Sequence, residues 1–283
     1  MTRTGYGFGV VVLAAGLTAG YFGWRNATSP APTAPTTEMA TALPPTPPPS
    51  AAEPAVRYPI EAPLAASASQ AETAAQATAP GSRFKIALDE LLGTAAVLQW
   101  VQLDDFAHRL VATVDNLARA HAAAQLWPVN PTPGRFSPSE TPQGPLIGTT
   151  NQARYAAFVG LVERVDSRHA LAIYRRLYPL FQTAYEDLGF PGRYFNDRLV
   201  EVIDHLLATP EPTEPLMVQL VDVKGRVPSL RPWVRYEFSD AELEARSAGQ
   251  KILLRMGLDQ QRRLKSKLAE VRRLLTQPTS GGN

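Results

Sequence analysis

Glu201, Asp204 and His205 form the most enzyme-like cluster in the chain, within the run EVIDHLL. Glu201 and His205 are four residues apart, so in a helix they share one face, where the carboxylate could orient the imidazole or raise its pKa. A Glu/His pair on a helix surface is also typical of a solvated or packing contact. No nucleophile, Gly-rich phosphate-binding loop or paired-carboxylate signature accompanies the cluster, so the sequence favours a protein that is not an enzyme.

Metal and cofactor sites are not indicated either. The four histidines (His108, His121, His169 and His205) form no H-x-x-x-H or H-E-x-x-H pair. Zinc motifs depend on such spacings, so we expect no metal and no cofactor. The chain also has no cysteine, which excludes a lipoprotein because the lipid would need a cysteine to modify.

A second constellation mixes arginine and tyrosine, which together are enriched at binding surfaces. Its members are Arg175, Arg176, Tyr178, Arg193, Tyr194 and Arg198. Such a set could hold a glycan, a peptide or a carboxylate. The tyrosines also fit the buried stripe of the helix expected there, whereas packing does not account for the arginines.

The third constellation is a basic face on the last expected helix, formed by Arg262, Arg263, Lys265 and Lys267 and continued by Arg272 and Arg273. Such a face could hold anionic lipid headgroups or another polyanion. The alternative interpretation is an ordinary solvated helix face. Nucleic acid is not expected as a partner, because the topology derived below places this helix outside the cytoplasm.

An uncharged run from Gly5 to Trp24 predicts that residues 1–25 form a transmembrane anchor. Its length of about twenty residues matches the roughly 30 Å hydrocarbon core of a bilayer. A cleaved signal peptide is the alternative, but the run is long, ends in an aromatic cluster, and is not followed closely by an A-x-A-like site. The membrane is thus the first expected partner. Gly16 and Gly20 form a G-x-x-x-G pair, typical of a homodimer interface or of general small-residue content.

Residues 26–80 are rich in Pro, Ala, Thr and Ser, which predicts a disordered tether. The run PPTPPP at residues 44–49 is typical of a stiff spacer, with a docking ligand for an aromatic groove as the alternative. A short island, Arg57–Ile60, interrupts the low complexity, and we expect it to pack on the folded domain.

Residues 81–277 have the composition of a globular domain, and residues 278–283 of a flexible tail. Apolar spacing of three and four predicts a mainly α fold, all-α or nearly so. The expected helices cover 86–92, 95–103, 104–126, 151–166, 167–188, 196–209, 239–256 and 259–275.

Details of these helices follow from single residues. Ser167 is expected as an N-cap, Asn196 or Asp197 as another, and Ser239 or Asp240 as a third. Pro179 should kink or break the helix that contains it. Residues 97, 98 and 101 should supply an inner face.

Two regions are expected to be non-helical. The Pro/Gly-rich stretch 127–150 predicts a long loop whose apolar residues hold it on the surface. Residues 216–223 and 235–238 could pair as a two-stranded hairpin.

Three stretches together resemble a proteobacterial family of membrane-anchored proteins of unknown function. They are RLYPLFQTAYEDLG at 176–189, YFNDRLVEVIDHLLATP at 194–210, and YEF through SAGQKILLRMG at 236–257. The resemblance implies an anchor, a tether and a head in a Gram-negative envelope. It implies no activity and no site residues.

The sequence therefore predicts a single-pass protein of the inner membrane. The slight charge bias around the anchor places the helical C-terminal domain in the periplasm. There it should bind an envelope protein or a cell-wall component. The alternatives are an envelope-acting hydrolase that uses Glu201 and His205, and a structural spacer that oligomerises through Gly16 and Gly20.

Overall fold

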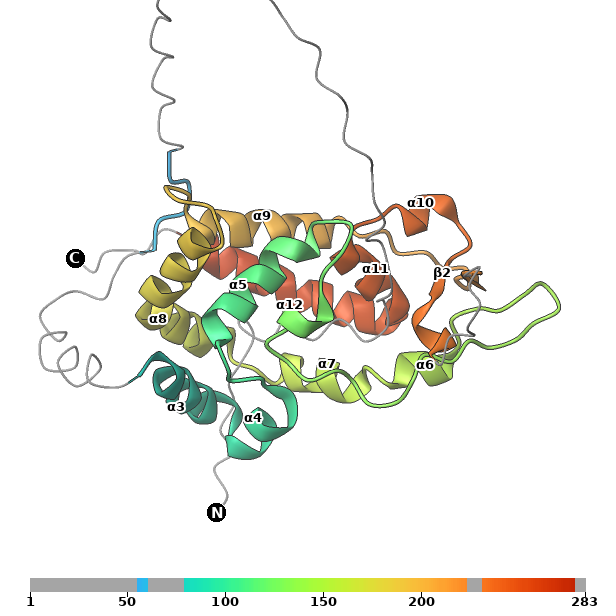
Figure 1. Cartoon of the computed structure of the whole chain (residues 1–283), viewed down its shortest axis with the longest axis horizontal. Helices are drawn as coiled ribbons and strands as arrows, with labels where there is room; N and C mark the ends of the chain where they lie inside the picture. The colour runs from blue at the N-terminus through green and yellow to red at the C-terminus, as the bar shows by residue number, and fades with distance from the viewer. Residues whose placement is uncertain (1–54, 61–78, 223–230, 278–283) are drawn as a thin grey trace, which may run out of the picture.

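The protein is described by a computed structural model over residues 55–60, 79–222 and 231–277 (Figure 1). The described part is mainly helical, as expected. Its helices are α3 (Pro80–Leu92), α4 (Thr94–Trp100), α5 (Phe106–Leu117), α6 (Thr149–Ala153), α7 (Ala156–Glu163), α8 (Ser167–Asp187), α9 (Phe195–Leu207), α10 (Ala241–Glu244), α11 (Ala248–Arg255) and α12 (Leu258–Thr276). Two short strands, β1 (Val218–Leu220) and β2 (Tyr236–Phe238), and two single 3₁₀ turns complete it.

The expected anchor at residues 1–25, including Gly16 and Gly20, lies outside the described residues, as does the tail at 278–283. Among the helices that the structure does describe, none is both long and apolar enough to cross a bilayer.

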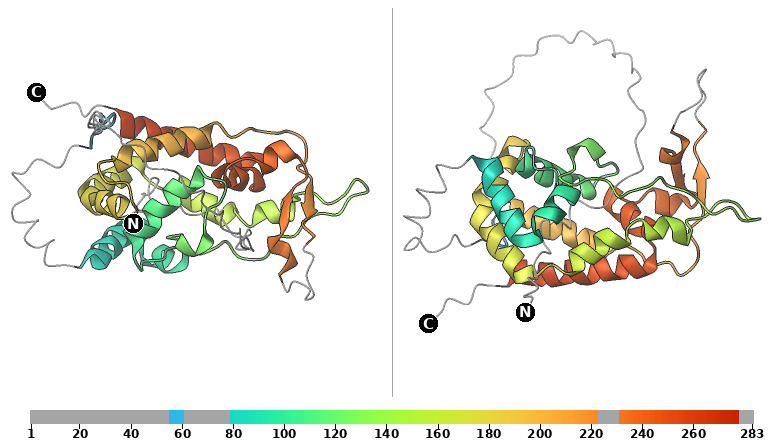
Figure 2. Two further views of the ribbon diagram at one scale, coloured as in Figure 1. Left: turned by 45° about the horizontal axis from the view of Figure 1, so that its top comes forward. Right: turned by 90° about the horizontal axis from the view of Figure 1, so that it is seen from below.

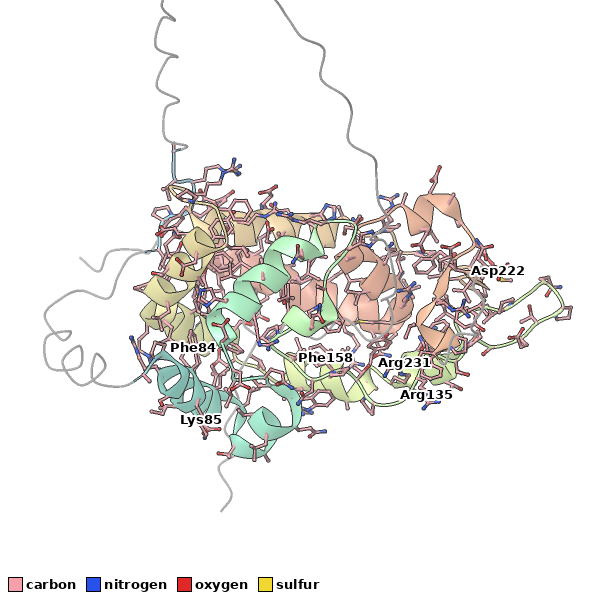
Figure 3. All side chains as sticks on the ribbon, viewed as in Figure 1. Phe84, Lys85, Arg135, Phe158, Asp222 and Arg231 are labelled. Atoms are coloured by element: carbon pink, nitrogen blue, oxygen red, sulfur yellow. The ribbon has the colours of Figure 1, made fainter. Side chains whose placement is uncertain are left out.

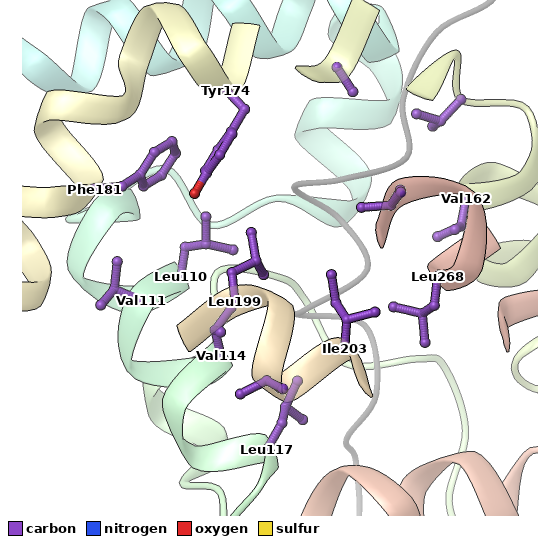
Figure 4. Close-up of a cluster of buried hydrophobic side chains, with 14 of the residues drawn as sticks. Leu110, Val111, Val114, Leu117, Val162, Tyr174, Phe181, Leu199, Ile203 and Leu268 are labelled. Atoms are coloured by element: carbon purple, nitrogen blue, oxygen red, sulfur yellow. The ribbon is translucent and has the colours of Figure 1, made fainter. Parts of the chain in front are cut away.

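The main core lies where α5, α8, α9, α12 and α7 converge (Figure 4). α12 runs along most of the domain and packs against α7, α8, α9 and α11 (Figure 2). Its inward stripe is Leu264, Leu268, Val271 and Leu275, as the spacing predicted, and all four are buried. Burying an aliphatic side chain of this size stabilises a fold by about 1.5–3 kcal/mol relative to exposing it.

α8 shows that Pro179, at which the sequence predicted a kink or a break, does not break α8. The helix is a single element from Ser167 to Asp187. An interior proline costs about 3 kcal/mol, but here Pro179 itself is exposed, while the buried rings of Tyr174, Tyr178 and Phe181 lie on both sides of it. Packing of that aromatic stripe holds both halves on the same core and offsets the lost hydrogen bond.

Several expected boundaries were wrong for local reasons. Asp166, not Ser167, caps α8, since its Oδ1 accepts hydrogen bonds from the N–H groups of Arg168 (2.8 Å) and His169 (3.3 Å). Leu98 is 72% exposed rather than inward, because α4 turns Val97 and Trp100 to the core instead.

The long helix expected at 104–126 is only α5, which starts after Asp105 in the left-handed conformation (φ 52°). The stretch 151–166 folds as α6 and α7, and 239–256 as α10 and α11. The latter pair is separated because Asp240 caps α10 as expected, while Ser247 accepts from Gln250 N and caps α11 anew.

The end of the domain opposite α8 carries the hairpin. β1 and β2 pair antiparallel, with Val218 opposite Phe238, which confirms the expected pairing. The Pro/Gly-rich loop adds to it through bridges of Leu146 to Ser139 and Met217. A second apolar cluster forms beneath, from Phe136, Ile147, Val218, Phe238 and Leu254. The loop is therefore packed on the domain, as predicted.

Asp222 and Arg231 are the described residues on either side of residues 223–230, and Figure 3 labels both at the hairpin end of the domain. Arg135 of the Pro/Gly-rich loop lies over the ring of Trp233, with its guanidinium carbon 4.0 Å from the ring centre. Phe84 and Lys85 of α3 lie at the other end of the domain.

Candidate peptide-binding site

Residues 55–60, which belong to the expected tether, lie against the start of α9 (Figure 1). The carboxylate of Asp197 accepts two hydrogen bonds from consecutive backbone groups of this segment. Arg57 N donates to Oδ2 (2.9 Å) and Tyr58 N donates to Oδ1 (2.8 Å). A bend at these two residues turns both N–H groups to one side, an arrangement that suits an anionic acceptor. The expectation that the island packs on the domain is confirmed.

Two further side chains bind the same segment. Asn196 Nδ2 donates to the carbonyl of Tyr58 (2.8 Å), and Ile60 N donates to the hydroxyl of Tyr194 (2.6 Å). Pro59 has no N–H, so every backbone N–H of residues 57–60 is hydrogen-bonded. We call the three residues Tyr194, Asn196 and Asp197 the α9 clamp.

The side chains of the segment alternate between the domain and solvent. Tyr58 and Ile60 are partly buried and pack against the main core, whereas Arg57 and Pro59 are exposed. In the left view of Figure 2, the last turn of α12 lies beside the segment. Backbone hydrogen bonds and the side chains of Tyr58 and Ile60 thus hold the segment on the domain.

Asn196 and Asp197 do not cap α9, contrary to expectation. α9 begins at Phe195, so both residues lie inside its first turn, and no side chain caps the helix. A carboxylate in the first turn is favoured by the helix dipole wherever its oxygens point. Both side chains point to the segment, which leaves the cap position to Tyr194.

A buried network fixes the orientation of Asn196, whose side chain is fully buried (0% exposed). The Tyr58 carbonyl can only accept a hydrogen bond, so the amide NH₂ must face it and Oδ1 must face the hydroxyl of Tyr174, which donates at 3.2 Å. The hydroxyl of Tyr178 accepts from Asn196 N (3.2 Å) and donates to Gln182 (3.0 Å). Burial raises the pKa of both Tyr174 and Tyr178, so both hydroxyls stay protonated.

The structure divides the predicted arginine/tyrosine set. Tyr194 binds the segment and Tyr178 positions the clamp. Arg198 instead ties α9 to α5, since its Nε lies 2.9 Å from the buried carboxylate of Asp115. The other three arginines differ: Arg176 lies 3.4 Å from Glu90 on α3, Arg193 is exposed, and Arg175 has a buried Nε without a hydrogen-bond partner among the described residues.

Glu201, Asp204 and His205 do not act as one cluster, because each contacts a different partner. Glu201 lies 3.0 Å from Arg198, and Asp204 pairs with Arg272 on α12 (Oδ2 to Nη2, 3.0 Å). His205 Nε2 lies 2.9 Å from Ser247 Oγ, a contact that the sequence did not reveal.

Of the two effects considered for Glu201, orienting the imidazole of His205 or raising its pKa, a net rise in the pKa does not occur. Burial and the positive charge of Arg198 lower it, and these outweigh the opposing effect of Glu201. A neutral imidazole beside a serine hydroxyl is the arrangement of a base and a nucleophile.

Ser247, however, is only 8% exposed and caps α11 by accepting from Gln250 N. Its surroundings are closed as well. A Cβ on the nearby Gly249 would lie 2.5 Å from Leu206 and 2.9 Å from the carbonyl of Leu117. The geometry around Ser247 is therefore that of a tightly packed helix cap. Nowhere in the described ranges do three or more His, Cys, Asp or Glu residues group as a metal site would require.

The basic face of α12 is engaged with other elements. Arg262 and Lys265 both pair with Glu211 (2.9 and 2.7 Å), and Arg263 pairs with Glu163 on α7 (Nε to Oε1, 2.8 Å). The hydrogen bond from Arg263 lowers the pKa of Glu163.

Lys267 is buried and donates to the carbonyl of Val165 (2.6 Å) and to Glu270 (3.0 Å). These cations join α12 to its neighbours.

The chain matches the model of a protein family of unknown function, DUF3014, over residues 106–272. The chain belongs to this family. No curated protein and no solved structure matches it. The matched range runs from the start of α5 to within α12, so the DUF3014 domain contains the whole α9 clamp. The bound segment 57–60 lies outside that range.

Sequence reasoning did not predict that Asn196 and Asp197 bind a distant segment of the chain, because both residue types also suit a helix N-cap. One signal was available. The island around Tyr58 interrupts a low-complexity tether, and an Asn-Asp pair directly follows two aromatic residues. Only the fold shows that these two features meet.

Proposed function

We propose that this chain is a non-catalytic binding module whose DUF3014 domain accepts a short peptide at the α9 clamp. The observation that supports this is the occupied clamp itself. Three side chains make four hydrogen bonds to backbone groups of residues 57–60. Because backbone groups are common to all peptides, the same side chains can bind a peptide from another molecule.

We further propose that the module is held at the inner membrane by residues 1–25 and works in the periplasm. The uncharged run Gly5–Trp24 and the resemblance of the head to membrane-anchored proteins support this setting. The tether then lets the domain reach an envelope protein or a cell-wall component that presents the peptide.

The test uses the full-length chain with its own segment weakened by Tyr58→Ala and Ile60→Ala. A fluorescent peptide with the sequence of residues 55–61 should bind this variant saturably, as measured by anisotropy. Adding Asp197→Ala should abolish the binding, because it removes the acceptor of two hydrogen bonds. Equal anisotropy curves with and without Asp197→Ala would contradict a peptide site at the clamp.

The contact between His205 and Ser247 favours one second candidate, an envelope hydrolase that uses His205 with Glu201. Ser247→Ala and His205→Ala separate the two. Because Ser247 caps α11, Ser247→Ala should cost about 1 kcal/mol of stability under either interpretation. A hydrolase should also lose its cellular function in both variants, whereas a helix cap should show no specific loss of function.

A further inference from the structure

The contacts at the clamp favour particular residue types as well as a peptide backbone. It binds N–H groups at two consecutive positions, the carbonyl of the second, and the N–H of the fourth. The third position is the only one whose N–H the clamp does not use, and it is the position that Pro59 occupies. The second and fourth side chains, Tyr58 and Ile60, are the ones that pack on the core.

We propose that the ligand of the α9 clamp is a peptide carrying an aromatic residue, a proline and an aliphatic residue in succession, and that it displaces residues 57–60. This inference rests on the proposed function. The ligand comes from a second protein, and its binding frees the tether segment from the domain.

Proline suits the third position for two physical reasons. It restricts its own φ angle, so the free peptide loses less conformational entropy on binding. It also biases the preceding residue away from the helical and toward an extended conformation, which suits the presentation of the aromatic residue's carbonyl to Asn196. An alanine at this position keeps the hydrogen bonds but loses the preorganisation.

Displacement follows because the clamp cannot serve two peptides. Both oxygens of Asp197 are engaged by the segment, and the NH₂ group of Asn196 is directed at Tyr58 by the hydroxyl of Tyr174. A second peptide therefore needs the same groups that residues 57–60 occupy.

Release lengthens the connection between the start of the chain and the domain. While the segment is bound, the part of the chain that precedes residue 57 is attached to the domain at the clamp. After release it continues to α3, which adds about 20 residues, or up to roughly 60 Å when extended. Ligand binding would thus extend the reach of the domain.

The experiment follows trypsin cleavage after Arg57 in the full-length chain by mass spectrometry. Asp197 holds the N–H of the Arg57–Tyr58 peptide bond itself and the N–H of Arg57, so cleavage requires the segment to leave. The probe is the peptide Ala-Val-Gln-Tyr-Pro-Ile-Glu, capped at both ends, in which glutamine replaces the arginine that trypsin would cut. Because a tethered segment acts at an effective concentration near millimolar, the probe is titrated into that range.

We expect the probe to accelerate cleavage of the wild-type chain about tenfold or more, toward the rate of the Tyr58→Ala, Ile60→Ala chain. A control peptide with alanine in place of its tyrosine and isoleucine should have no effect. A probe with alanine in place of its proline should require a higher concentration. Equal potency of the control peptide would overturn the proposed motif.

Two outcomes distinguish displacement of the segment from the peptide site itself. If the fluorescent peptide binds the Tyr58→Ala, Ile60→Ala chain but the probe leaves cleavage of the wild-type chain unchanged, displacement is wrong and the peptide site stands. If the fluorescent peptide does not bind the Tyr58→Ala, Ile60→Ala chain at all, both the proposed function and this inference are wrong. Because Tyr58 and Ile60 pack on the core, a thermal melt of this variant checks that the domain stays folded.

Discussion

The α9 clamp and the basic face of α12 are both polar surfaces, but they bind different kinds of groups. The clamp consists of three side chains, of which Asn196 is fully buried, and it binds the backbone of a distant segment. The basic face is larger and more exposed, and its cations mainly bind carboxylates of the same domain.

The difference shows that charge density alone is a poor guide to binding. A row of cations on a helix finds acidic partners on neighbouring elements, because pairing reduces repulsion and satisfies donors. Buried neutral groups with a fixed orientation have fewer alternatives, so the partner they hold is specific. The predictions below test this contrast, from the largest expected effect to the smallest.

Asn196→Ala should cost about 2–3 kcal/mol of unfolding free energy. It leaves the buried hydroxyl of Tyr174 without its acceptor and the carbonyl of Tyr58 without its donor. Urea denaturation measures the loss, and trypsin cleavage after Arg57 should accelerate in the same variant.

Gln143→Ala, in the exposed part of the loop, serves as the control. If both variants lose the same stability, the network around Asn196 does not support the clamp.

Lys267→Met should lower the free energy of unfolding by about 1–2 kcal/mol, because the carbonyl of Val165 loses its donor. Methionine keeps a long unbranched side chain at this position. Arg273→Met, exposed on the same helix, should stay within about 0.5 kcal/mol of wild type. Neither change should alter trypsin cleavage after Arg57. Faster cleavage in Lys267→Met would show that the two surfaces are coupled.

Arg263→Gln should cost at most about 1 kcal/mol, since its pair with Glu163 is more than one-third exposed on both sides. The difference from wild type should shrink at high salt, which screens exposed charges. Chemical denaturation by urea at low and high salt measures it. A loss that persists unchanged at high salt would mean that the pair acts through packing instead of charge.

The smallest effect concerns two histidines whose pKa values shift in opposite directions. Burial, followed by the charge of Arg198, lowers the pKa of His205 below 6.5, so its contribution to stability is present above pH 6.5 and is lost as the pH falls.

Burial alone would lower the pKa of His108, but hydrogen bonds to Asp105 and Asp187 outweigh it and raise the value. Its contribution is therefore present below pH 6.5 and is lost as the pH rises through the raised pKa. NMR titration of the two imidazoles should give one midpoint on each side of 6.5. Coincident midpoints would refute both assignments.

Much of the fold was predictable because it depends on short-range patterns. The stripe from Leu264 to Leu275 has helical spacing, and the alternation at Val218 and Leu220 suits a strand. Predictions failed where tertiary packing outweighs a local preference. Pro179 stays inside α8 because its aromatic neighbours are buried on both sides, and Ser167 is displaced as a cap by Asp166.

By itself, the sequence determined the helical character of the domain, the hairpin, and the presence of a segment around Tyr58 unlike the rest of the tether. Periodicity and composition carry these properties, since they depend on residues close together along the chain. Only the tertiary structure decided that Asp197 binds Arg57, 140 residues away, and that the cations of α12 meet acidic partners. Contacts of that kind depend on which surfaces the packed core brings together, and no local pattern encodes them.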